Sequence, residues 1–253
     1  SGLDPKPGVA ARAQFFPNME QALICGGEIE EDPFALHLDV CGQALGARAR
    51  GSYALASDAL RGLTLSQLAL FKADARILST HHGSYGSSRS ESTLWLYHVL
   101  DSADREEFWS DGASYERNLQ AHFVLYASSQ AHVLEVPGFT PFALDNSIML
   151  PCTNPVGRAE DSLGGALTRY CHPDSISLEL PMAVGHVQES LRARFPITRE
   201  ARPPRFNDFL REFVRRQFGL FKSGDPGRRL NLFAEVVRDL STASVEGRLH
   251  HLT

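Results

Sequence analysis

The chain has 253 residues, which is enough for one large domain or two small ones with a substantial core. Its formal net charge of -5 and its pI near 6.1 give no general attraction to nucleic acid or to anionic membranes. No apolar run approaches the roughly 20 residues that a membrane-spanning helix needs. A globular protein without a nucleic-acid partner and without a membrane span is therefore expected.

Two features favour a cytoplasmic location. Residues 1–4 contain no basic segment followed by an apolar one, so a signal peptide is not expected. The cysteines form no CxxC pair, which argues against a structural zinc site and against a disulfide framework. Buried, reduced thiols are expected at Cys25, Cys41, Cys152 and Cys171.

The first half of the chain predicts helices and short strands behind a flexible N-terminus. Residues 1–12 are rich in Pro and Gly and predict a flexible lead-in. Asp32 is suited to capping a helix and Pro33 to its first turn, and apolar residues then recur at helical spacing up to Gly46. Further along, the pattern predicts a helix over 58–72, strands over 75–80, 122–126 and 132–136, and a Gly/Ser-rich loop over 81–90.

The second half predicts one helix and one strand before a helical C-terminus. The helix is expected from about Glu160 to Tyr170, and apolar and polar residues alternate as in a strand from Ile176 to Leu180. After an Arg/Pro-rich linker, amphipathic helices are predicted over 206–220 and 230–240. We therefore expect an α/β domain over 13–198 and a helical extension over 206–253, which could dock onto an additional domain or a second subunit.

Two adjacent carboxylates, Glu160 and Asp161, are the first candidates for catalysis. At a helix start, the dipole and the free N–H groups favour an acid even where it does no chemistry. One of the two could instead take a proton from an acceptor hydroxyl as a general base, with its neighbour orienting it. Arg158 could contact a phosphate or a carboxylate, and Gly164 would let a backbone or a ligand approach closely. Asp145 and Asn146 offer further polar groups upstream, which would line the acceptor side.

His186 follows an apolar strand and is the next candidate. A histidine in this place is either a structural residue or a ligand. In open α/β sheets, ligands bind at the carboxyl ends of the strands. A neutral imidazole there could complete a Mn²⁺ or Mg²⁺ site with carboxylates and diphosphate oxygens.

The segment from His81 to Ser88 is a second candidate site. Adjacent histidines point in different directions on a strand and rarely bind one metal together. Ser84 lacks the full Gly-x-Ser-x-Gly frame of a nucleophile elbow, so a serine hydrolase would need a distant His and Asp that the sequence cannot identify. A loop near a ligand and a plain surface loop are the other interpretations.

Three short motifs carry a resemblance to a known family: Leu144-Asp145-Asn146, Pro155 to Asp161 with Gly164, and Gly185-His186. The stretch from about Arg76 to Gln188 resembles the later, acceptor-side half of GT-A type nucleotide-sugar glycosyltransferases. The resemblance implies a GT-A-like mixed sheet flanked by helices and a sugar moved from a nucleotide-sugar donor to a hydroxyl acceptor. By the same resemblance Asp161 is the base, Glu160 its neighbour, and His186 a ligand of a divalent metal, Mn²⁺ or Mg²⁺.

One departure from that family supports an alternative function. A complete GT-A domain carries an Asp-x-Asp metal motif in its nucleotide-binding half, and this sequence contains no Asp-x-Asp. Either the nucleotide-binding half lies upstream of this sequence, or the chain is a non-catalytic binding or scaffold domain with a transferase-like fold.

Overall fold

The computed structural model describes residues 3–4, 12–16, 20–21, 24, 32–49, 65–87, 110–113, 123–127, 131–134, 143–186, 205–217 and 224–244. These residues form a mixed sheet and two groups of helices, so the chain belongs to the α/β class, as predicted. The strands are β1 (Leu3–Asp4), β2 (Arg12–Phe16), β3 (Arg76–Ser87), β4 (Phe123–Ala127), β5 (Ala131–Leu134), β6 (Ala143–Leu144) and β7 (Ser175–His186).

The two longest strands, β3 and β7, form the middle of the sheet. The strand order is β1-β5-β7-β3-β4-β2, and β6 pairs with β3 beside this path. β3 and β7 run parallel, in a register that extends from Arg76 opposite Ser175 to Gly86 opposite His186. β4 and β5 pair with them antiparallel, so parallel and antiparallel ladders meet in one sheet.

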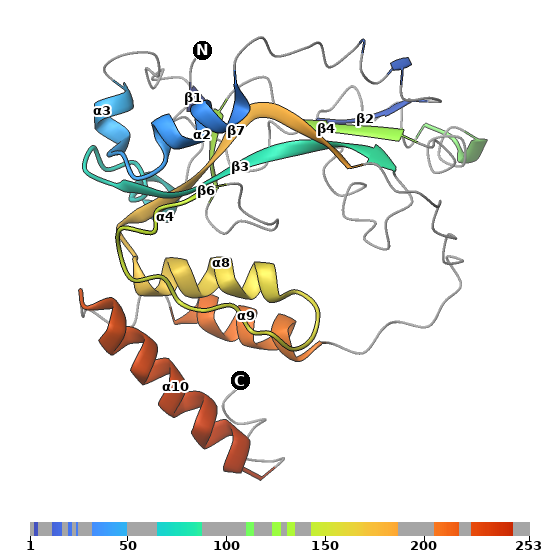
Figure 1. Cartoon of the computed structure of the whole chain (residues 1–253). Coiled ribbons are helices and arrows are strands. Elements are labelled where there is room, and N and C mark those ends of the chain that lie inside the picture. Colours follow the sequence, from blue (N-terminus) through green and yellow to red (C-terminus); the bar gives the residue numbers. More distant parts are fainter. Residues whose placement is uncertain are drawn as a thin grey trace.

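The helices lie in two groups on different sides of the sheet (Figure 1). The N-terminal group consists of α2 (Pro33–Val40), α3 (Leu45–Ala49) and α4 (Leu65–Leu68), and the other group of α8 (Glu160–Cys171), α9 (Phe206–Arg216) and α10 (Pro226–Thr242). Asp32 caps α2 as predicted, since its side chain accepts a hydrogen bond of 2.9 Å from the Phe34 N–H. Asp225 caps α10 in the same way.

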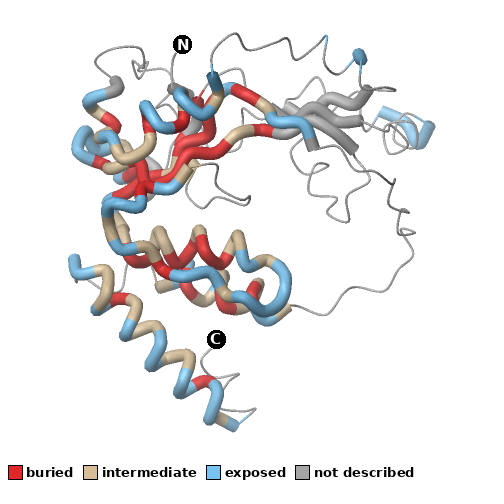
Figure 2. Tube along the Cα trace, in the orientation of Figure 1, coloured by how far each residue is buried: buried red, intermediate tan, exposed pale blue. Residues whose placement is uncertain are grey.

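The first core lies between the central strands and the N-terminal helices. Alternate residues of β7 supply one face of this core. Each large aliphatic side chain that is buried there stabilises the fold by roughly 1.5 to 3 kcal/mol. Figure 2 shows buried residues concentrated along these strands. The cluster consists of Val40, Leu45, Leu70, Ala75, Ile77, Ala131, Val133, Ile176, Leu178, Leu180 and Met182.

A second core joins α8, α9 and α10. Its buried members are Leu163, Ala166, Leu167, Tyr170, Cys171, Leu210 and Val214. Arg229 of α10 is 1% exposed. Its guanidinium lies 4.8 Å from the centre of the Tyr170 ring, and its Nε donates a hydrogen bond to the Tyr170 carbonyl. The described part of the predicted C-terminal extension therefore packs on α8.

Four predictions about local structure need correction. The helix predicted over 58–72 ends at Leu68 in the described part of that range. β3 continues through His81 to Ser87, where a loop was expected, because β4 and β7 pair with this Gly- and Ser-rich segment on both sides. The helix predicted up to Gly46 ends at Val40, since Gly42 takes a φ of 84° and its N–H donates to the Ile77 carbonyl. β7 extends to His186, beyond the predicted end at Leu180.

The prediction of buried cysteines is only partly right. Cys171 is buried, Cys41 is half-buried and Cys152 is exposed, and all three are free thiols. Cys25 lies outside the described residues.

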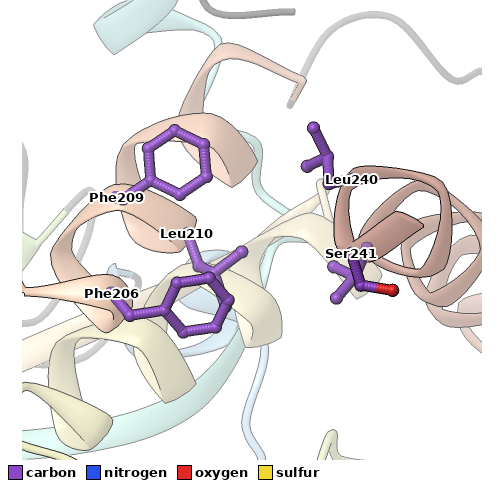
Figure 3. Close-up of a pocket in the computed structure, with 6 residues that line it drawn as sticks. Phe206, Phe209, Leu210, Leu240 and Ser241 are labelled. Carbon is purple, nitrogen blue, oxygen red and sulfur yellow. The ribbon is translucent and has the colours of Figure 1, made fainter. Parts of the chain in front are cut away.

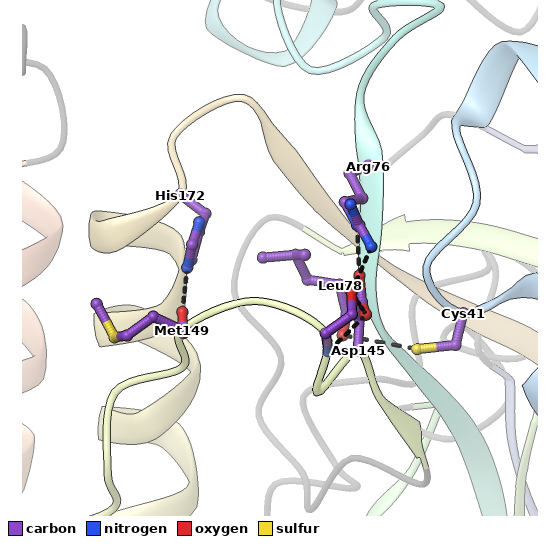
Figure 4. A network of polar contacts seen from close by, with 7 residues as sticks. Cys41, Arg76, Leu78, Asp145, Met149 and His172 are labelled. Atoms are coloured by element: carbon purple, nitrogen blue, oxygen red, sulfur yellow. Dashed lines mark hydrogen bonds and ion pairs between the residues drawn. The ribbon is translucent and has the colours of Figure 1, made fainter. Parts of the chain in front are cut away.

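Asp145 ties the segment that follows β6 to the start of β3 (Figure 4). Its carboxylate accepts a hydrogen bond from Arg76 Nε. It also accepts hydrogen bonds from the Ser147 N–H at 3.1 Å and from the Ser147 Oγ at 2.7 Å. The backbone N–H of Asp145 donates to the Leu78 carbonyl at 2.8 Å. Burial alone would raise the pKa of Asp145, but these hydrogen bonds outweigh burial and lower the pKa below its ordinary value. The charged form therefore stabilises the fold above the ordinary pKa, and this contribution is lost as the pH falls through the lowered pKa.

We expect Asp145→Ala to lower the free energy of unfolding by about 2 to 4 kcal/mol, because it leaves Arg76 and Ser147 without their acceptor. Urea unfolding followed by circular dichroism measures the loss. The exposed neighbour supplies the control, since Asn146→Ala should change stability by less than about 0.5 kcal/mol. Equal losses in the two variants would contradict the role of Asp145.

Candidate functional site

Glu160 and Asp161 open α8, as predicted. Glu160 is exposed and Asp161 is half-buried, with its Oδ1 accepting a hydrogen bond of 2.7 Å from the Ser162 N–H. The N-cap residue is Ala159, which makes no side-chain hydrogen bond to the helix. The two carboxylates therefore meet the positive end of the helix dipole at a position that a solute can reach.

The loop before α8 holds an unusual backbone. Gly157 has a φ of 86° and Ala159 a φ of 67°, and Ala159 is the one non-glycine residue with a positive φ among those described. The left-handed region costs an alanine on the order of 1 to 2 kcal/mol. Such strain persists only where surrounding contacts enforce it, and it is concentrated at functional sites.

Asn207, in the first turn of α9, supplies those contacts. Its side chain is buried, at 3% exposure, and its Nδ2 donates to the carbonyls of Val156 at 3.1 Å and Arg158 at 3.0 Å. Its Oδ1 accepts from Asn154 Nδ2 at 2.8 Å. Both sides of the amide are thus used to hold the loop that leads into Glu160 and Asp161.

A side chain at position 157 would disturb this contact. A Cβ built on Gly157 would lie 3.2 Å from Asn207 Nδ2, so the glycine serves both the positive φ and the close approach of the amide. Sequence reasoning missed Asn207 because an asparagine near a helix start is typical of ordinary capping. Its separation of about 50 residues from the loop hides the contact.

The other predicted substrate-binding residues lie in different surroundings. Arg158 is exposed on the loop itself, and Asn146 is exposed next to the buried Asp145. Gly164 is buried in α8, and a Cβ there would lie 3.2 Å from Thr153 Cγ2, so the helix packs closely on the preceding segment. Their roles in binding a substrate stay predictions.

His186 is the last residue of β7 and lies opposite Gly86 at the carboxyl ends of two parallel strands, as predicted. Only residues 172–174 separate α8 from β7, so the start of α8 and the end of β7 point toward the same side of the molecule (Figure 1). Because a 12-residue helix spans about 18 Å and a 12-residue strand about 40 Å, the end of β7 extends well beyond the start of α8. The side chain of His186 lies outside the description, and its role as a ligand stays a prediction.

The paired histidines of β3 lie on opposite faces of the sheet, as the alternation of a strand requires. His81 Nε2 is 2.9 Å from Ser79 Oγ, whereas the His82 ring meets the His37 ring of α2 at 6.1 Å. Burial lowers the pKa of His81 to about 3 and that of His37 to about 4, so both rings are neutral at neutral pH. The side chain of Ser84 is not among those described.

A small apolar pocket of about 330 Å³ lies between α9 and α10 (Figure 3). Its lining residues are Phe206, Phe209, Leu210, Val237, Leu240 and Ser241. The described residues that line the pocket include no carboxylate and no histidine. Phe206 precedes Asn207, which places one wall beside the residue that holds the loop.

Two kinds of feature are absent from the described residues. No group of three or more His, Cys, Asp and Glu side chains among them is arranged to hold a metal ion. No helix in the described ranges is long and apolar enough to cross a membrane.

Comparison with known proteins gives no assignment. No family model, no curated protein and no solved structure matches this chain.

We expect Asn207→Ala to lower the free energy of unfolding by about 2 to 3 kcal/mol and to speed amide exchange in the loop at 156–160, because three hydrogen bonds are lost. Hydrogen exchange with mass spectrometry measures both effects. Asn231→Ala makes the same change at an exposed position of α10 and should leave exchange in the loop unaltered. Unaltered exchange in Asn207→Ala as well would contradict the role of Asn207 in holding the loop.

Proposed function

We propose that this chain is a glycosyltransferase domain of GT-A type, which moves a sugar from a nucleotide-sugar donor to a hydroxyl acceptor. Asp161 is the general base, Glu160 its neighbour, and Arg158 a contact for phosphate. The observation that carries the proposal is the accessible carboxylate pair at the start of α8, reached through a strained loop that Asn207 holds.

The position of the pair supports this chemistry. A base for an acceptor hydroxyl must be open to solute, and Glu160 is exposed while Asp161 is half-buried. Asp161 accepts a hydrogen bond from the adjacent Ser162 N–H, which orients one oxygen and leaves the other for a proton. Ala159, with its left-handed backbone, directly precedes both residues as the N-cap of α8.

In the proposed reaction, each of these groups has a defined role. Asp161 takes the proton of the acceptor hydroxyl as the acceptor oxygen bonds to the anomeric carbon of the sugar. The bond from that carbon to the diphosphate oxygen breaks, and its electron pair leaves with the diphosphate, whose charge Arg158 offsets. A divalent metal, Mn²⁺ or Mg²⁺, would stabilise the same charge. His186 is the ligand we propose for it, and at the end of the longer β7 it would bind the metal on the side of the diphosphate away from Asp161.

A second candidate is a non-catalytic binding domain with the same fold. The sequence contains no Asp-x-Asp, and this observation favours a domain that binds a sugar or nucleotide without transfer. Such a domain would use the same loop and carboxylates for recognition.

We expect Asp161→Asn to abolish sugar transfer while the fold and its stability are retained, because the amide is isosteric and cannot accept the proton. Product formation is measured by mass spectrometry, and circular dichroism verifies the fold. Asp239→Asn, at an exposed position of α10, is the matched control and should transfer at the unchanged rate. Unchanged turnover in Asp161→Asn would rule out its role as the base.

A further inference from the structure

Four polar side chains meet on the face of the sheet opposite the first core. Leu178 of β7 belongs to that core, so Ser177 and Glu179, which lie on either side of it in the strand, are on the other face. In β3, Ser79 is in register with Ser177, and His81 with Glu179. Because neighbouring strands are about 4.8 Å apart, residues in register on the same face lie side by side. The two central strands therefore bring two serines, one histidine and one carboxylate together.

A chain of hydrogen bonds joins three of these side chains. Ser177 Oγ lies 2.6 Å from Ser79 Oγ, and Ser79 Oγ lies 2.9 Å from His81 Nε2. When the His81 ring carries its proton on Nδ1, Nε2 accepts from Ser79 Oγ, and Ser79 Oγ accepts from Ser177 Oγ. A proton can then pass from Ser177 through Ser79 to His81. A serine becomes a nucleophile when a base removes its proton in this way.

Glu179 supplies the carboxylate that orients such a histidine. His81 is 1% exposed and Glu179 is 4% exposed. Neither His81 Nδ1 nor Glu179 Oε1 has a hydrogen-bond partner among the described residues, although the two residues lie opposite each other in register. Catalytic hydrogen bonds are often long before a substrate binds and tighten in its complex. A hydrogen bond from Nδ1–H to Glu179 would satisfy both atoms, fix the tautomer of the ring and stabilise the imidazolium that forms during a reaction.

The serine at the outer end of this chain is accessible, and its neighbours on the same face are apolar. Ser177 is half-buried, whereas Ser79 is 3% exposed. Leu144 of β6 is in register with Ser79, and Leu134 of β5 with Ser177, so a leucine flanks the two serines on each side. Leu144 is 49% exposed, which leaves this row open to a solute. An apolar acyl group can pack on these leucines while its carbonyl carbon meets Ser177 Oγ.

We propose that these four side chains form an esterase site for esters of small apolar acids. Ser177 Oγ attacks the ester carbonyl carbon, and its proton passes through Ser79 to His81 Nε2. The bond from that carbon to the alcohol oxygen then breaks, and the alcohol leaves with the proton from His81, so the acyl group stays on Ser177. Water attacks the acyl group with the same proton transfers, which releases the acid and restores Ser177. Glu179 acts through His81 as a positioning residue.

A fluorophosphonate probe tests the nucleophile in the whole chain, because its phosphorus bonds to an activated serine oxygen as fluoride leaves. We expect mass spectrometry to find the label on Ser177 in the folded chain and no label after heat unfolding. Ser177→Ala should abolish labelling, and Ser79→Ala and His81→Gln should each slow it by about 100-fold or more, since both interrupt the proton path. Ser175→Ala is the matched control, because this serine precedes Ser177 by two residues and donates to the His172 carbonyl; its labelling rate should be unchanged.

Hydrolysis of p-nitrophenyl butyrate tests the role of Glu179. Glu179→Gln, an isosteric change, should lower kcat by about 100-fold or more and leave KM unaltered, and Glu179→Asp should recover part of the loss because it keeps the acid. Circular dichroism verifies the fold of each variant. A label on a serine other than Ser177, no label on the folded chain, an undiminished labelling rate in Ser79→Ala, or an unchanged kcat in Glu179→Gln would overturn the proposal. None of these measurements contains a nucleotide sugar, so their outcome is independent of sugar transfer.

Discussion

The parallel ladder between β3 and β7 is the constraint on which the rest of the structure depends. It extends over nearly the whole length of both strands, from Arg76 opposite Ser175 to Gly86 opposite His186, with two register shifts along the way. One face of these strands supplies the core under the N-terminal helices. The other ladders attach β4, β5 and β6 to this pair, so the register of β3 on β7 determines where every strand lies.

The same ladder helps to fix the positions of the residues on which the proposed function depends. Because β7 follows α8 after a connection of three residues, fixing β7 also fixes the end of α8, and the second core fixes its direction. Asn207 then connects α9 to the loop before α8. The positions of Glu160 and Asp161 therefore depend on β7, on the second core and on α9. On the sheet itself, register alone brings His81 and Glu179 to adjacent positions.

The sequence predicted the elements with strong local signals and missed those that depend on distant partners. Periodicity indicated α8 and the C-terminal helices, and Asp32 with Pro33 indicated the start of α2. The Gly/Ser-rich composition from His81 onward favoured a loop, because strand pairing on both sides cannot be seen locally. The hydrogen bonds of Asn207 to the loop before α8, and the register of His81 with Glu179, join residues far apart in the sequence. No local pattern reveals such contacts.

A thermal-shift titration with a panel of nucleoside diphosphate sugars, with and without Mn²⁺, tests the central claim most directly. A donor present at 100 times its dissociation constant should stabilise the protein by about 2.7 kcal/mol, which corresponds to a rise of several degrees in the melting temperature. We expect a rise that depends on Mn²⁺ and is confined to one nucleotide class. No rise with any member of the panel would contradict the assignment of this chain as a nucleotide-sugar glycosyltransferase.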